Sequence, residues 1–120
     1  MQTGAQAYSN AQRTAVSPRD REAMLLIKAA SQLQTVQDNW DEHRQTLREA
    51  LTYNRKLWSI LVTSIGREEN TLPIEIKNNI GSLGVFIFRQ TLDLEAKPAP
   101  EKLKALISIN RELAAGLRGR

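Results

Sequence analysis

Apolar side chains recur at helical spacing in four successive segments, and this is the main signal in the sequence. In the first segment they fall three or four positions apart, as on the buried face of an amphipathic helix: Leu26, Ala29, Ala30, Leu33 and Val36. The stretch "SPRDRE" marks the start, with Ser17 as the expected N-cap, Pro18 as the first helical residue and Asp20 in the first turn. The pattern predicts a helix that ends near Gln37.

The second segment follows the polar stretch "DNWDEHR", in which Asp38, Asn39 and Asp41 are candidate capping residues. Its apolar stripe consists of Leu47, Leu51, Trp58, Val62 and Ile65. Gly66 is the expected C-cap, because glycine commonly ends a helix. The sequence therefore predicts a second, long helix that ends at Ile65.

The third and fourth segments are separated by the two prolines of "AKPAPE", which cannot continue a helix. After the turn "REENTLP", Asn70 or Thr71 is the expected cap of the third helix, with Pro73 in its first turn. Its main stripe is Ile76, Ile80, Leu83, Ile87 and Leu94. The fourth helix is expected to start near Pro100 and to bury Leu103, Leu106, Ile107, Leu113, Ala114 and Leu117. These segments predict an all-α fold, a small bundle of four main helices.

The domain organisation follows from length and composition. A chain of 120 residues is expected to form one domain. Residues 1–16 are small and polar, with Tyr8 and Val16 as the sizeable hydrophobes after Met1, so they are expected to be a flexible segment or a short extra docking helix before a single helical domain at 17–120. The sequence shows no signal peptide, no membrane-spanning apolar run and no Cys, which predicts a cytoplasmic protein without membrane insertion.

The residue types offer no set that catalysis would need. The single His, His43, stands in a charged stretch at a helix start, and the acid pairs Asp41–Glu42 and Glu68–Glu69 stand at helix ends or turns. No phosphate-binding glycine loop, nucleophile elbow or HExxH motif is present, since "GSLG" lies within a helical apolar pattern. We therefore expect no enzyme, no catalytic or metal-ligating residue and no cofactor.

Two of the predicted helices are apolar on more than one face. On a helical wheel Gly81, Val85, Phe88 and Leu92 fall together, nearly opposite the main stripe of the third helix. A helix that is apolar nearly all round either lies in the centre of the fold or offers a face to a partner, and both interpretations stay open. The second interpretation predicts a partner-binding groove formed by Tyr53, Leu57, Ile60, Val85, Phe88 and Leu92.

Polar residues also lie on or near these apolar stripes. Asn110 stands on the stripe of the fourth helix, and Arg55 stands near that of the second. Each either extends its head group to solvent or hydrogen-bonds across helices and sets their register. In the same stretch, "NRKLW", Trp58 is expected in the core and Lys56 in solvent.

The positive charge is concentrated at the end of the chain. Residues 97–120 contain six cations and two anions, so their excess of four equals the net charge of +4. One interpretation is a solvated helix end whose cations complement the helix dipole. The alternative is an RNA-binding surface formed by Lys97, Lys102, Lys104, Arg111, Arg118 and Arg120. Direct nucleic-acid contact is the less favoured interpretation, because no RRM, KH or aromatic platform accompanies these cations.

Several short motifs, spread over almost the whole chain, carry a family resemblance. They are Tyr8, "SPRDRE" with "LLIKAA", "NRKLWSIL", "NTLPIEIKNNIGSLGVFIF" and "LISINRELAAGL". In this order and spacing they resemble the FlaF family of flagellar biosynthesis regulators of alphaproteobacteria. The resemblance implies a helical, non-enzymatic protein that acts after transcription with a second regulator, FlbT, and promotes flagellin production.

The same resemblance implies a partner, because a protein of this family looks like a chaperone that engages flagellin before its secretion. We therefore expect flagellin, and with it FlbT, as partners. The RNA alternative becomes contact with flagellin mRNA through the basic C-terminal segment.

Overall fold

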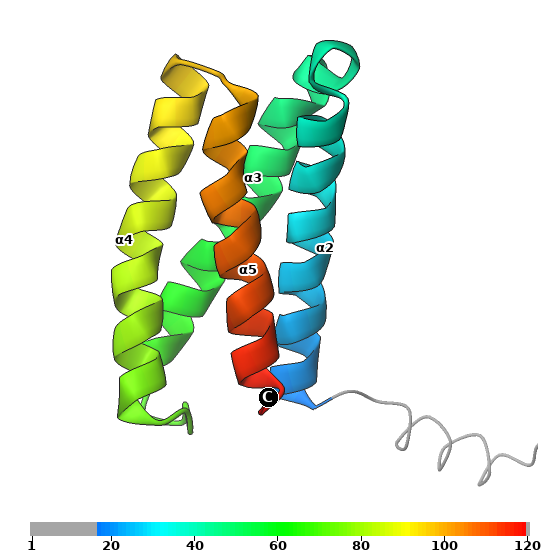
Figure 1. Ribbon diagram of the computed structural model, residues 1–120. Coiled ribbons are helices and arrows are strands. Elements are labelled where there is room, and N and C mark those ends of the chain that lie inside the picture. The colour runs from blue at the N-terminus through cyan, green and yellow to red at the C-terminus, as the bar shows by residue number, and fades with distance from the viewer. Residues whose placement is uncertain (1–16, 120) are drawn as a thin grey trace, which may run out of the picture.

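The computed structural model describes residues 17–119, apart from the side chain of His43, and it confirms the all-α bundle of four main helices (Figure 1). The elements are α2 (Pro18–Asp38), α3 (Trp40–Ile65), α4 (Ile74–Ala96), the 3-10 turn η1 (Pro100–Lys102) and α5 (Leu103–Leu117). Successive helices run in opposite directions, and no strand occurs in the described part of the chain. The predictions for residues 1–16, including Tyr8, and for Arg120 lie outside the described residues.

Local capping signals set the first helix boundary as predicted. The Ser17 hydroxyl oxygen accepts a hydrogen bond from the backbone N–H of Asp20 at 3.1 Å, and Pro18 opens α2. Gly66 is the C-cap of α3, also as predicted. Asn39 joins α2 to α3, but its side chain donates back to the Thr35 carbonyl at 3.1 Å and does not cap α3.

The prediction for the start of α4 is wrong by a few residues. Pro73 is the N-cap, and neither Asn70 nor Thr71 caps the helix. The Asn70 side chain instead accepts a hydrogen bond from the Leu72 N–H at 2.9 Å and donates to the Ser64 hydroxyl at 3.0 Å. Asparagine readily bonds to a backbone group two residues on, and here that bond shapes the turn before the helix.

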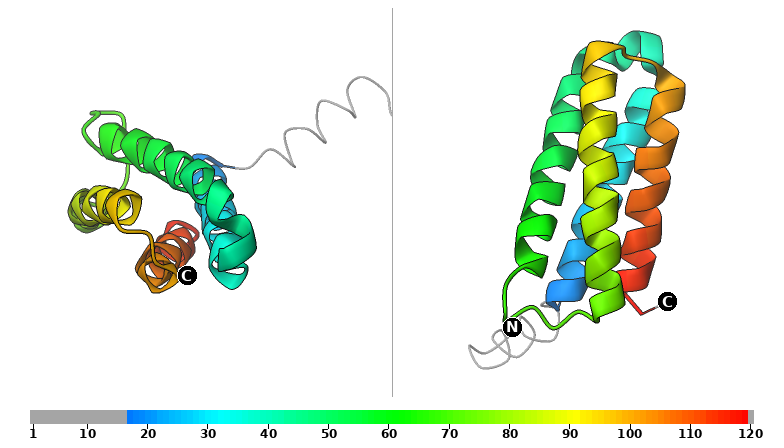
Figure 2. Two further views of the ribbon diagram at one scale, coloured as in Figure 1. Left: turned by 90° about the horizontal axis from the view of Figure 1, so that it is seen from above. Right: turned by 90° about the vertical axis from the view of Figure 1, so that its left-hand side faces the viewer.

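The helices pack unevenly around the bundle. α2 packs along α5 and against α3, whereas α4 packs on α3 and meets α5 only slightly. Seen along the bundle axis, α4 lies on the far side from α2 (Figure 2). A hollow of about 190 Å³ separates α4 from α5, lined by Ile76, Asn79, Leu83, Ile109, Glu112, Leu113 and Gly116. The bundle is therefore loosely closed along one side.

The predicted apolar stripes form the core. Its largest fully buried apolar side chains are Trp58, Leu26, Leu33, Leu51, Ile80, Ile87, Leu94, Leu103 and Leu106. Val62 and Ile65, predicted on the stripe of α3, are half-buried and pack against this core. Over residues 17–119, no helix has the length and apolarity that crossing a bilayer requires.

A glycine allows α4 to approach α3 closely. A Cβ atom at Gly84 would stand 2.7 Å from Val62 Cγ2, well inside van der Waals contact. At Gly81, one turn earlier, a Cβ atom would stand 3.8 Å from Ile65 Cδ1, which is an ordinary contact. Gly84 is thus required by packing, and Gly81 is not.

These two glycines should respond in opposite directions to the same substitution. Gly81→Ala should raise the free energy of unfolding by up to about 1 kcal/mol, because alanine favours the helix. Gly84→Ala should lower it by about 1 kcal/mol, because overpacking typically costs about 1–3 kcal/mol and exceeds that gain. Urea denaturation followed by circular dichroism measures both. Stabilisation by Gly84→Ala in the wild-type background would contradict the close approach, and Val62→Ala should relieve the clash.

Candidate functional site

A chain of three hydrogen-bonded side chains crosses the core between α3 and α5. The Trp58 indole N–H donates to Asn110 Oδ1 at 2.8 Å, and Asn110 Nδ2 donates to Asn54 Oδ1 at 2.6 Å. All three side chains are fully buried. The sequence allowed Asn110 either to extend its head group to solvent or to hydrogen-bond across helices. The structure shows the hydrogen bond across helices.

This cluster holds the fold and offers no reactive group. It contains no ionisable side chain, and one amide N–H₂ group, that of Asn54, has no hydrogen-bond partner. The sequence interpretation missed Asn54, although it precedes Trp58 by four residues and so lies on the same helix face. Arg55, the neighbouring residue, is exposed and reaches solvent.

The six residues predicted to bind a partner differ in their exposure. Ile60 is 67% exposed, Leu92 66% and Val85 51%, while Tyr53 and Phe88 are half-buried against the core. Leu57 is only 6% exposed and belongs to the core, so the prediction that it lies on an exposed, partner-binding face is wrong. Binding at these residues stays a prediction.

These residues also lie on different sides of α3. Tyr53 and Ile60 line hollows that α3 shares with α2, in which Gln32 and Glu22 are the facing residues. Val85 and Leu92 belong to α4, which packs on another side of α3. The residues predicted to form one partner-binding groove thus lie at separate locations, Tyr53 and Ile60 towards α2 and Val85 and Leu92 on α4.

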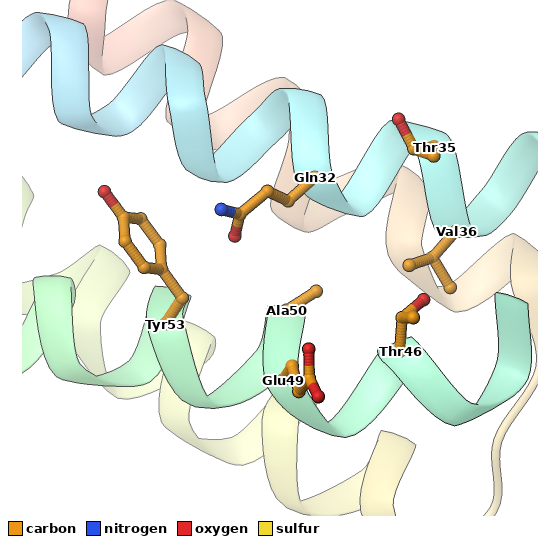
Figure 3. Close-up of a pocket in the computed structure, with 7 residues that line it drawn as sticks. All are labelled: Gln32, Thr35, Val36, Thr46, Glu49, Ala50 and Tyr53. Atoms are coloured by element: carbon orange, nitrogen blue, oxygen red, sulfur yellow. The ribbon is translucent and has the colours of Figure 1, made fainter.

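The hollow beside Tyr53 has a volume of about 440 Å³ and lies between α2 and α3 (Figure 3). Its lining residues are Gln32, Thr35, Val36, Thr46, Glu49, Ala50 and Tyr53. Lys28 Nζ lies 5.4 Å from the centre of the Tyr53 ring, a cation–π contact at one end of the hollow. Glu49 is the one carboxylate among the lining residues, and the hydroxyl groups that line the hollow with it are those of Thr35, Thr46 and Tyr53.

A second hollow, of about 470 Å³, lies between α3 and the C-terminal half of α4. Its lining residues are Arg44, Leu47, Arg48, Leu51, Thr52, Arg55, Leu94, Glu95 and Pro98. The three arginines are exposed, and within residues 17–119 none of them forms an ion pair. Arg44 lies 5.9 Å from the Trp40 ring centre. The sequence interpretation missed this cluster, although spacings of four and seven residues predict a common helix face.

The C-terminal cations, predicted as the RNA alternative, fall into two groups. Lys102 pairs with Asp93 at 2.9 Å and donates to the Lys97 carbonyl at 2.8 Å, so it caps the end of α4. Lys104 and Arg111 of α5 and Arg118, the C-cap of that helix, are exposed and stand seven residues apart, which places them on one face. Arg111 also donates to Gln34 Oε1 at 3.3 Å.

Metal ligands do not gather anywhere in the described structure. Among residues 17–119, no group of three or more His, Asp or Glu side chains is placed to hold a metal ion. The acids Asp41, Glu42, Glu68 and Glu69 are exposed at helix ends or turns. The side chain of His43 lies outside the described part.

Comparison with known proteins gives one match. A family model described as "Flagellar protein FlaF" matches residues 4–117, which is nearly the whole chain. The search of curated proteins and the search of solved structures found no match.

Asn110→Ala should lower the free energy of unfolding by about 2–4 kcal/mol, because it leaves the buried Trp58 N–H without an acceptor and Asn54 Oδ1 without a donor. Urea denaturation followed by circular dichroism measures the change. Asn78→Ala, at an exposed position of α4, is the matched control and should stay within about 0.5 kcal/mol of wild type. Equal effects of the two substitutions would contradict a stabilising role for the buried chain.

Proposed function

Because the chain belongs to the FlaF family of flagellar proteins, we propose that it is a non-enzymatic chaperone that binds flagellin and regulates flagellin synthesis after transcription. In this proposal binding takes place in the cytoplasm before flagellin is exported, and FlbT is the second partner. The observation that carries the proposal is a set of exposed apolar side chains that share one side of α4: Ile74, Val85 and Leu92, which are 65%, 51% and 66% exposed.

In this proposal, these three side chains contact a helix of the partner. Val85 and Leu92 are seven residues apart, and Ile74 falls on the same side of α4 by helical periodicity. A helical partner that laid its apolar face along this side would remove all three from water. Burial of apolar surface contributes about 25 cal/mol per Å², so such a contact favours binding without any catalytic chemistry.

The chaperone role follows from what such a contact prevents. An unassembled subunit exposes apolar surface that later lies inside its assembly, and such surface promotes aggregation. A small helical protein that covers it keeps the subunit available for export. When the chaperone releases the subunit, the same apolar surface becomes available for assembly. The need for release favours a contact of moderate size.

A second candidate function is binding to flagellin mRNA. The observation that favours it is the alignment of Lys104, Arg111 and Arg118 on one exposed face of α5. Arg111 is engaged with Gln34, and no aromatic side chain stands on α5 for base stacking. This candidate is therefore the weaker one.

Leu92→Asp should weaken flagellin binding at least about tenfold, because it places a charge in the proposed apolar contact. Calorimetry with purified flagellin measures the affinity, and the helical content should stay at the wild-type level, since the residue is 66% exposed. Met24→Asp, at a 51% exposed position of α2, is the control and should bind as wild type does. Flagellin binding that is unchanged by Leu92→Asp would exclude this side of α4 as the contact.

The double variant Lys104→Glu with Arg118→Glu tests the RNA candidate. If α5 binds RNA, a gel shift with flagellin mRNA should appear at low salt, fall steeply as salt rises and disappear in the variant. We expect that wild type gives no salt-sensitive shift of the RNA that is lost in the double variant. The appearance of such a shift would favour the RNA function instead.

A further inference from the structure

We infer that an acidic amphipathic helix binds along a groove between α3 and α4, which we call the α3–α4 groove. Its basic part is the hollow lined by Arg44, Arg48 and Arg55 of α3, and its apolar part is the exposed pair Val85 and Leu92 of α4, which lies outside that lining. The inference rests on the proposed function in one respect, since it assigns this chemistry to a segment of flagellin.

The basic half of the groove is the hollow of about 470 Å³ at the C-terminal end of α4. Leu47, Leu51 and Leu94 line it with apolar atoms and are at most 6% exposed. Arg48 and Arg55 stand above them, exposed and without an ion pair among the described residues. The structure therefore offers two free guanidinium groups beside an apolar floor.

The apolar half of the groove continues along α4. Gly84 and Gly81 face Val62 and Ile65 of α3, so this flank of α4 borders α3. Val85 lies next to that flank and is 51% exposed. α3 and α4 run in opposite directions, so the C-terminal end of α4 lies beside the part of α3 that carries the arginines. Val85 stands nearer the N-terminus of α4 than Leu92 does, and it is therefore farther from the arginines along the bundle.

The length of the exposed stripe fits a helical ligand. Ile74 and Leu92, both exposed, are 18 positions apart on α4, which corresponds to about 27 Å of helix at 1.5 Å per residue. About five turns of a partner helix would cover this distance. The partner's apolar stripe would lie against Val85 and Leu92, and its carboxylates would lie at the arginine end.

Charge complementarity selects the ligand. A guanidinium group binds a carboxylate through two parallel hydrogen bonds, and partial removal of water strengthens that pair. Glu95 is the one acid that lines the hollow, and it would repel a carboxylate next to it, which favours contact with the α3 side. Phosphates of RNA would also meet the arginines. However, the lining contains no aromatic side chain on which a base could stack.

The test is the affinity of purified flagellin for wild type and for two double variants of the full chain. Arg48→Glu with Arg55→Glu should raise the dissociation constant at least about tenfold, and added salt should weaken its binding less than it weakens that of wild type. Lys104→Glu with Arg118→Glu makes the same change in net charge on α5 and is the matched control. It should stay within about threefold of wild type. Circular dichroism confirms that each variant is folded.

The possible outcomes separate the two proposals. No binding of flagellin to wild type would overturn the proposed function together with this assignment. Binding by wild type and equal binding by the Arg48/Arg55 variant would overturn the groove alone. An equal loss in both variants would show an effect of net charge and overturn the groove as well. A gel shift with flagellin mRNA is run on the same Arg48/Arg55 variant, and loss of RNA binding with flagellin binding intact would assign the arginines to RNA instead and overturn the groove.

Discussion

The hydrogen bond from the Trp58 indole to Asn110 is the contact on which the arrangement of the helices depends. It joins α3 to α5 inside a mainly apolar core, and Asn110 extends it to Asn54. A slip of either helix would leave buried donors without acceptors, at a cost of about 1–3 kcal/mol for each group. Because α2 packs on both α3 and α5, the register of these two helices also determines where α2 lies, whereas α4 packs mainly on α3.

The position of α4 follows from a different constraint, namely its close approach to α3 at Gly84. α4 is held mainly by this one neighbour, since it meets α5 only slightly. Within residues 17–119, its apolar residues are therefore not all covered. Some pack against α3 and others, including Val85 and Leu92, stay exposed. A helix attached mainly along one side would suit a helical partner, because among the described residues its outer side is exposed.

The protein carries cations on two helices, and their surroundings give them different capacities. On α3 the arginines stand beside an apolar hollow and an exposed apolar stripe, an environment that suits an amphipathic segment with carboxylates. On α5 the aligned cations stand on a solvated helix face, where attraction to an anion is screened by salt. In our proposal, the arginines of α3 therefore bind a protein partner, whereas the α5 cations attract at most a diffuse anion.

Much of the fold could be predicted from the sequence, because its determinants are local. Ser17, Pro18 and Gly66 act on backbone groups within a few residues, and the spacing of apolar residues predicts which face of a helix is buried. The candidate site could be predicted only in part. A wheel shows that a second face is apolar, but only the packing of neighbouring helices decides that Leu57 is buried and Leu92 is not. Likewise Asn54, Trp58 and Asn110 belong to distant parts of the chain, and their hydrogen bonds exist only once α3 and α5 meet.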